Sequence, residues 1–309
     1  DYRPVFDSLD QQELAESRLE KEYGKELWFT VGMYAAKNDI NYIKAWAKFV
    51  SNPKLGLLVS SIQKENAVKG ELNTETTAVL DLALILLFSS INRLDILNAV
   101  AKRLLIARSV LEEIEAFKRE ISLLSEGMMS IGKQNGQYYR SILTEEAKQE
   151  ELRRLNRLLV WLNENCEALP SNELLDINRK EKEKLDQLLG APTVDSIFLA
   201  KEHNARIYFA EGSLRALSYV KYELKTGTIL RLIDIGLNSG ILNRNQLDEV
   251  MMELIRLNCK YLPVTGAVLE RCADLSQYQA VGVFDVALQG LSPRITKDQY
   301  AIAAVVDFT

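Results

Sequence analysis

The sequence predicts a three-layer α/β domain built on a parallel sheet, with helical extensions at both ends of the chain. Between Thr77 and Lys118, short apolar runs alternate with longer amphipathic runs, which is the strand, helix, strand, helix order of a parallel sheet covered by helices. The 309 residues, 47% of them hydrophobic, suffice to bury one large core with appended elements. We therefore expect four or five parallel strands.

The N-terminal stretch 8–68 is expected to be helical, because apolar residues recur among charged ones until a break at Asn52-Pro53. It has two interpretations, the last helical hairpins of a repeat array or a helical extension that packs on the following domain. No repeat period is detectable, which favours the extension. We place the boundary near residues 68–71, so that residues 1–70 form the extension and residues 71–274 form the main domain.

A long insertion, at about 120–190, is expected to form a hairpin and helices outside the core sheet, because elaborations of this size are tolerated at a sheet edge. Asn135-Gly136 is the favoured pair for a type I′ hairpin turn. Thr144 is expected to cap a helix that runs to Asn165, and a charged helix is expected over 179–189.

The C-terminal part predicts four helices with recognisable caps, at about 213–224, 228–239, 243–258 and 265–273. Residues 275–309 are expected to form a helical C-terminal segment. Because the sequence stops on an apolar run, we expect it to be a fragment of a longer chain.

Composition narrows the classes of function. A net charge of −5 and a pI near 5.3 do not fit a strongly electrostatic nucleic-acid binder, so any such affinity is expected from a local patch or another subunit. The single histidine, His203, excludes a metal site that needs two histidines within this chain. The three cysteines lack metal-ligand spacing and indicate reduced thiols in a cytoplasmic protein. The longest apolar stretch is too short to span a membrane.

Four acidic residues stand at the ends or beginnings of expected elements: Asp81, Glu113, Asp195 and Glu211. A carboxylate among apolar residues is costly unless it is paired, and four brought together would not all stay ionised without a cation. Carboxylate oxygens are ligands of hard divalent cations, so the set predicts a Mg²⁺ or Mn²⁺ site.

Each acid also has an ordinary structural interpretation. Asp195, or Thr193 in its place, would serve as a helix N-cap, which is worth about 1 kcal/mol. The acidic neighbours of Glu113 are alternatives to it as the site residue, although the apolar positions of the helix put Glu113 beside the buried face. Glu211 would equally suit a surface turn before Gly212. Asp81 has the weakest ordinary interpretation, because its neighbours are almost all apolar.

The order of these acids resembles that of the PIN-domain nucleases, over about residues 72–269. The similarity extends to the run Leu104-Leu105-Ile106-Ala107-Arg108 before the helix of Glu113 and to Ser213-Leu214-Arg215 after Glu211. It implies a PIN-type fold and Mg²⁺- or Mn²⁺-dependent hydrolysis of RNA, with the four acids as metal ligands and catalytic residues. Arg215 and Lys221 would contact phosphate. The alternative interpretation is that both are isolated surface charges surrounded by water.

Three positions depart from the family pattern: Leu82 and Phe209 replace small hydroxyl residues, and Glu211 replaces Asp. They support an alternative, a catalytically degenerate PIN fold that acts as a scaffold or regulatory module. A third interpretation, a helical interaction module without a metal site, requires Asp81 and Asp195 to lie far apart. The resemblance is to a bacterial branch found in large multidomain proteins, so the expected partners are RNA and the rest of a longer parent chain, with a protein partner or a second copy left open.

Overall fold

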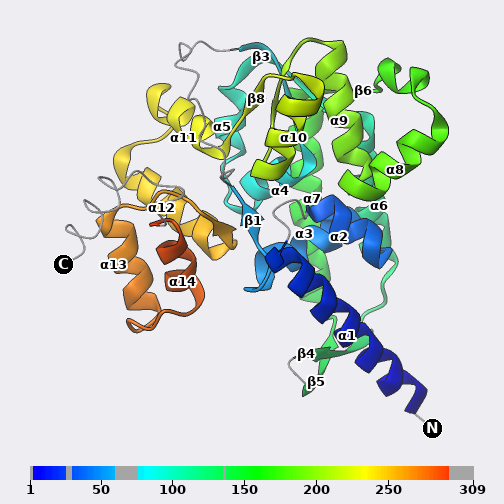
Figure 1. Cartoon of the computed structure of the whole chain (residues 1–309). Coiled ribbons are helices and arrows are strands. Elements are labelled where there is room, and N and C mark those ends of the chain that lie inside the picture. Colours follow the sequence, from blue (N-terminus) through cyan, green and yellow to red (C-terminus); the bar gives the residue numbers. More distant parts are fainter. Residues whose placement is uncertain (1–2, 26–29, 60–74, 135–136, 292–309) are drawn as a thin grey trace.

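The computed structural model describes residues 3–25, 30–59, 75–134 and 137–291 (Figure 1). Its centre is a five-stranded sheet in the order β6-β3-β2-β7-β8, and every strand pair in it is parallel. The strands are β2 (Glu75–Leu80), β3 (Ala101–Ala107), β6 (Cys166–Leu169), β7 (Arg206–Tyr208) and β8 (Thr226–Gly227). This confirms the expected α/β class with a parallel sheet, covered by helices as in a three-layer fold.

The connections that follow the two central strands, β2 and β7, lead to opposite edges of the sheet. After β2 the chain passes through α4 (Leu82–Ser90) and α5 (Leu94–Asn98) to β3, on one side. After β7 it passes through α10 (Gly212–Tyr222) to β8, on the other side. The carboxyl ends of β2 and β7 therefore flank a topological switch point, which is where open parallel sheets bind their ligands.

Helix α4 is the centre of the hydrophobic core. Its residues from Leu82 to Phe88 are all fully buried, as expected for a helix that is apolar on every side. Helix α6 (Arg108–Leu123) buries the predicted face, with Val110, Ile114 and Phe117. Helix α9 (Ala191–Glu202) packs across β2, β3 and β7.

The insertion contains the expected elements and two that were not expected, a 3-10 turn and a strand. Strands β4 (Met129–Gln134) and β5 (Gln137–Ile142) form the antiparallel hairpin, although its turn at 135–136 lies outside the described residues. Thr144 caps α7 (Glu145–Asn165), and a 3-10 turn, η1 (Asn172–Asp176), precedes α8 (Arg179–Leu189). The prediction that the insertion lies wholly outside the sheet is wrong, because β6 pairs with β3 as its edge strand. The sequence of β6 does not indicate a strand, because Glu167 interrupts its apolar residues.

The N-terminal extension contains α1 (Arg3–Lys25), α2 (Val31–Asn38) and α3 (Tyr42–Ser51). The expectation of helix up to residue 68 is wrong at β1 (Leu57–Leu58), which pairs in parallel with β9 (Cys259–Lys260). A two-residue strand is stabilised only by its distant partner, so the local sequence does not indicate it. The proposed boundary at 68–71 lies outside the described residues.

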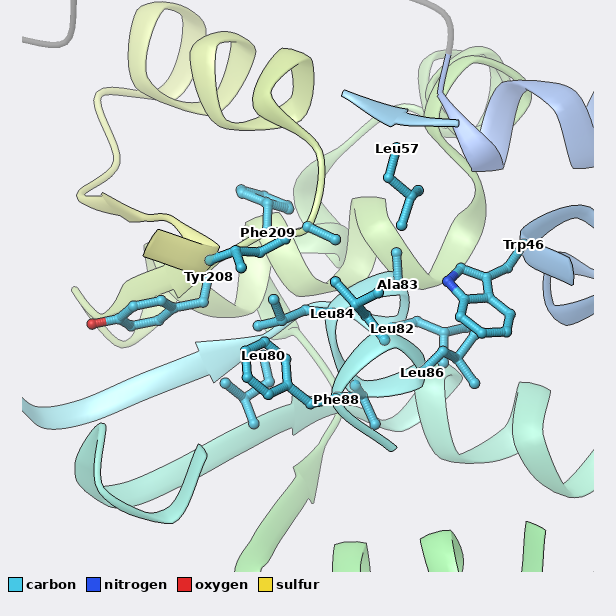
Figure 2. Close-up of a cluster of buried hydrophobic side chains, with 14 of the residues drawn as sticks. Trp46, Leu57, Leu80, Leu82, Ala83, Leu84, Leu86, Phe88, Tyr208 and Phe209 are labelled. Atoms are coloured by element: carbon cyan, nitrogen blue, oxygen red, sulfur yellow. The ribbon is translucent and has the colours of Figure 1, made fainter. Parts of the chain in front are cut away.

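The extension shares the core of the main domain. Figure 2 shows Trp46 of α3 in one buried apolar cluster with Leu82 and Leu86 of α4, and Leu57 of β1 near Ala83. Trp46 is 5% exposed and Leu57 is fully buried. Helices α2 and α3 are therefore packed on the centre of the fold.

The C-terminal helices begin close to the predicted positions, as α11 (Ile229–Asn238), α12 (Arg244–Arg256) and α13 (Gly266–Leu275), with α14 (Gly282–Gln289) following. Asn243 and Gln246 form a complete capping box at α12. No helix in the described part of the chain combines the length and the apolar character needed to cross a membrane.

Candidate functional site

Asp81 lies at the carboxyl end of β2 and is fully buried. Its Oδ2 accepts the Ala83 N–H at 3.1 Å, which caps α4, and its Oδ1 accepts the Thr193 hydroxyl at 3.0 Å. Burial raises the pKa of Asp81 from 3.8 to about 6, and these hydrogen bonds oppose the rise. The carboxylate is thus held in one orientation in a place that disfavours its charge.

Glu211 follows β7 and is also buried, so the alternative of a surface turn residue is wrong. Its Oε2 accepts the backbone N–H of Val31 at 3.1 Å, and its Oε1 is buried without a hydrogen-bond partner. Burial, and then the neighbouring charge of Asp81, raise the pKa of Glu211 from 4.5 to about 8. A buried carboxylate with one unpaired oxygen is suited to a cation.

Glu113 lies on the flank of the buried face of α6, as predicted, and is half-buried. Its Oε1 accepts the backbone N–H of Tyr42 at 2.7 Å. Val31 and Tyr42 are the first residues of α2 and α3. Two of the four acids therefore accept hydrogen bonds from the N-termini of two helices in the N-terminal extension.

The side chain of Tyr42 is the common neighbour of these groups. Tyr42 as a whole is 3% exposed. Burial, then the charges of Asp81 and Glu211 and more weakly that of Glu113, raise the pKa of Tyr42, while the Thr193 hydroxyl opposes the rise. The charges of three of the four acids thus act on one tyrosine, and no sequence pattern indicated this residue.

Asp195 is turned to a different partner. Its carboxylate pairs with Lys182 of α8, with Nζ and Oδ1 3.4 Å apart, and the lysine also contacts Asp186 at 2.8 Å. The expectation that Asp195 or Thr193 caps its helix is wrong, because α9 begins at Ala191 after Gly190. Gly190, with φ of 81°, and Pro192 start the helix earlier than the acid, since proline suits the first helical turn.

Within the described residues, no group of three or more histidine, cysteine or acidic side chains is arranged to hold a metal ion. The donor set nevertheless fits one, because Asp81 and Glu211 are buried with raised pKa values and the Oε1 atom of Glu211 is unpaired. The residues that replace the hydroxyl positions of the family, Leu82 and Phe209, are buried in the core.

The two basic residues expected to contact phosphate differ from each other. Arg215 is buried rather than solvated, and burial lowers its pKa to about 10. Lys221 is exposed, with Nζ 5.2 Å from the ring centre of Tyr222.

Thr193→Val is expected to destabilise the fold by about 1–3 kcal/mol at pH 7, because it leaves the buried Asp81 Oδ1 without a donor. Thr193→Ser retains a hydroxyl and is expected to cost less. Urea unfolding of both variants measures the difference. An equal loss in both would show that Thr193 acts through packing and not through its hydroxyl.

The described geometry defines an open parallel α/β domain with buried carboxylates at the switch point of its sheet. A family model described as a PIN domain associated with the TPR-GreAB-C-PIN system matches residues 79–220. This match confirms the resemblance to PIN domains over that segment, and α2 and α3 lie outside it. Neither a search of curated proteins nor a search of solved structures returned a match.

Proposed function

We propose that this protein is a Mg²⁺- or Mn²⁺-dependent endoribonuclease. PIN domains are generally nucleases, and the supporting observation is the pair Asp81 and Glu211, buried at the ends of the two central strands. The Glu211 Oε1 atom, buried and unpaired, is the strongest single sign that the site is built for a cation.

In this proposal Asp81, Glu113, Asp195 and Glu211 hold the cation. A bound divalent ion would activate water and neutralise charge on the scissile phosphate. Thr193 orients Asp81 through its hydroxyl. Lys221, exposed on α10, and Arg215, on the same helix, contribute positive charge for the RNA backbone.

The partners follow from the same family. Its description associates the PIN domain with TPR and GreAB-C components, and we propose that this chain acts on RNA beside such components, as part of a longer protein. The three free thiols agree with a cytoplasmic setting.

The second candidate is a catalytically degenerate PIN fold that serves as a scaffold or regulatory module. The observation that favours it is that all four acids already have protein partners: the N–H groups of Ala83, Val31 and Tyr42, the hydroxyl of Thr193 and the ammonium of Lys182. Leu82 and Phe209 add no hydroxyl group to the site.

Metal binding and RNA cleavage together separate the two candidates. For the nuclease we expect Mn²⁺ to stabilise the wild-type protein, by about 2.7 kcal/mol at a hundredfold excess over Kd, and to support RNA cleavage. Glu113→Gln should reduce both effects, whereas Glu112→Gln, an exposed neighbour on the same helix, should leave them unchanged. A wild-type protein that neither gains stability with Mn²⁺ nor cleaves RNA would support the scaffold.

A further inference from the structure

We propose that the helical pair α2–α3 is an intramolecular inhibitor of the acidic site, and that a divalent cation and this pair bind the site in competition. This inference rests on the proposed function, since it concerns regulation of the same site. It rests on three observations: the hydrogen bonds to the acids, the position of Tyr42, and the way in which α2 is seated.

The first observation is that both helices present their N-termini to carboxylates. The N–H of Val31 binds Glu211, and that of Tyr42 binds Glu113. The first N–H groups of a helix have no partner within the helix, and they carry the positive end of its dipole. They therefore take the place of a cation beside two acids that would otherwise repel each other and Asp81.

The second observation is the position of the Tyr42 side chain. It is buried, and the charges of Asp81, Glu211 and Glu113 all act on it. These three acids are expected ligands of the cation. The fourth expected ligand, Asp195, is paired with Lys182. A cation bound by these carboxylates would therefore lie in the surroundings of this buried side chain.

The third observation is the close seat of α2. A Cβ atom added to Gly32 would lie 1.8 Å from the Leu189 carbonyl oxygen at the end of α8, and one added to Gly190 would lie 3.2 Å from the Tyr42 ring. A glycine at this position lets α2 approach the backbone of α8 closely enough for Val31 to reach Glu211. This contact between α2 and α8 is separate from the acids, so a substitution there leaves the acids unaltered.

The inhibitor segment is distinct from the PIN domain in sequence. The family match begins at residue 79, so the two donors, at positions 31 and 42, are additions to the matched domain. If only molecules with α2–α3 displaced bind a cation, the apparent affinity for the cation is reduced by the fraction of molecules in that state.

The test uses the full chain and compares Gly32→Val with Ala36→Val. Both put valine into α2, but Gly32 faces α8 and Ala36 is exposed. Calorimetry with Mn²⁺ is expected to give Gly32→Val a Kd lower than that of the wild-type protein by about tenfold, and Ala36→Val a Kd within about twofold. Circular dichroism confirms that each variant is folded.

Hydrogen exchange of the wild-type protein provides a second readout that needs no variant. Saturating Mn²⁺ is expected to speed the exchange of the Val31 and Tyr42 amides, because both lose their carboxylate acceptors. Hydrogen exchange therefore tests the competition between the cation and α2–α3 even if Gly32→Val does not fold. If Mn²⁺ binds with these amides still protected, or binds wild type and Gly32→Val equally, the inhibitor is refuted while the nuclease stands. If neither protein binds Mn²⁺, the proposed function fails and the inhibitor fails with it.

Discussion

Asp81→Asn is expected to abolish Mn²⁺-dependent RNA cleavage while making the metal-free protein more stable near neutral pH. The cleavage is lost because the change removes a charged ligand that no other group at the end of β2 replaces. Asparagine still caps α4 through its side-chain oxygen, and its amide can donate to the Thr193 hydroxyl.

The gain in stability follows from the direction of the pKa shift. The pKa of Asp81 is raised in the folded protein to about 6 from 3.8, so the unfolded chain ionises first as the pH rises. Stability contributed by the protonated carboxyl is present below pH 3.8 and is lost as the pH rises to about 6. Above that pH the neutral asparagine avoids a cost on the order of 3 kcal/mol.

Melting and cleavage, each with and without Mn²⁺, measure the two effects of Asp81→Asn. The matched control is Asp176→Asn, an exposed acid in η1. Full RNA cleavage by Asp81→Asn would show that Asp81 is not a ligand of the catalytic metal. A large loss of metal-free stability in this variant would contradict the electrostatic argument.

Glu211→Gln is expected to flatten the dependence of metal-free stability on pH between about 5 and 8. The pKa of Glu211 is raised to about 8 from 4.5, so the wild-type protein loses stability through this window as the unfolded chain ionises and the folded carboxyl does not. At pH 8 and above, the folded protein must ionise a buried group. The expected gain for Glu211→Gln there is on the order of 4 kcal/mol, and glutamine still accepts the Val31 N–H.

Urea unfolding at pH 5, 6.5 and 8 tests this expectation, with Glu112→Gln as the exposed control. The double variant should gain less stability than the sum of the gains of Asp81→Asn and Glu211→Gln, because each carboxylate raises the cost of ionising the other. Parallel stability curves for the wild-type protein and Glu211→Gln would show that Glu211 is not held in a place that disfavours its charge.

The local sequence determined much of the parallel sheet and of the helices that cover it. Apolar runs at β2, β3 and β7 indicated strands, and alternation with amphipathic helices indicated a parallel sheet. The position of Asp81 after a buried strand followed from its apolar run, and that of Glu113 beside the buried face of α6 followed from helix spacing. These features could be predicted because each depends on neighbours within one or two turns of the chain.

The tertiary structure decided what surrounds the acids. Glu211 accepts an N–H from a residue 180 positions earlier, and Glu113 accepts one from a residue 71 positions earlier. Strand β6 and the pair β1–β9 likewise exist only through distant partners. Backbone N–H groups are the same in every residue except proline, so the sequence has no pattern that marks which of them meets a carboxylate. Only the packing of α2 on α8, and of α3 on α4 and α6, brings Val31 and Tyr42 to the ends of the central strands.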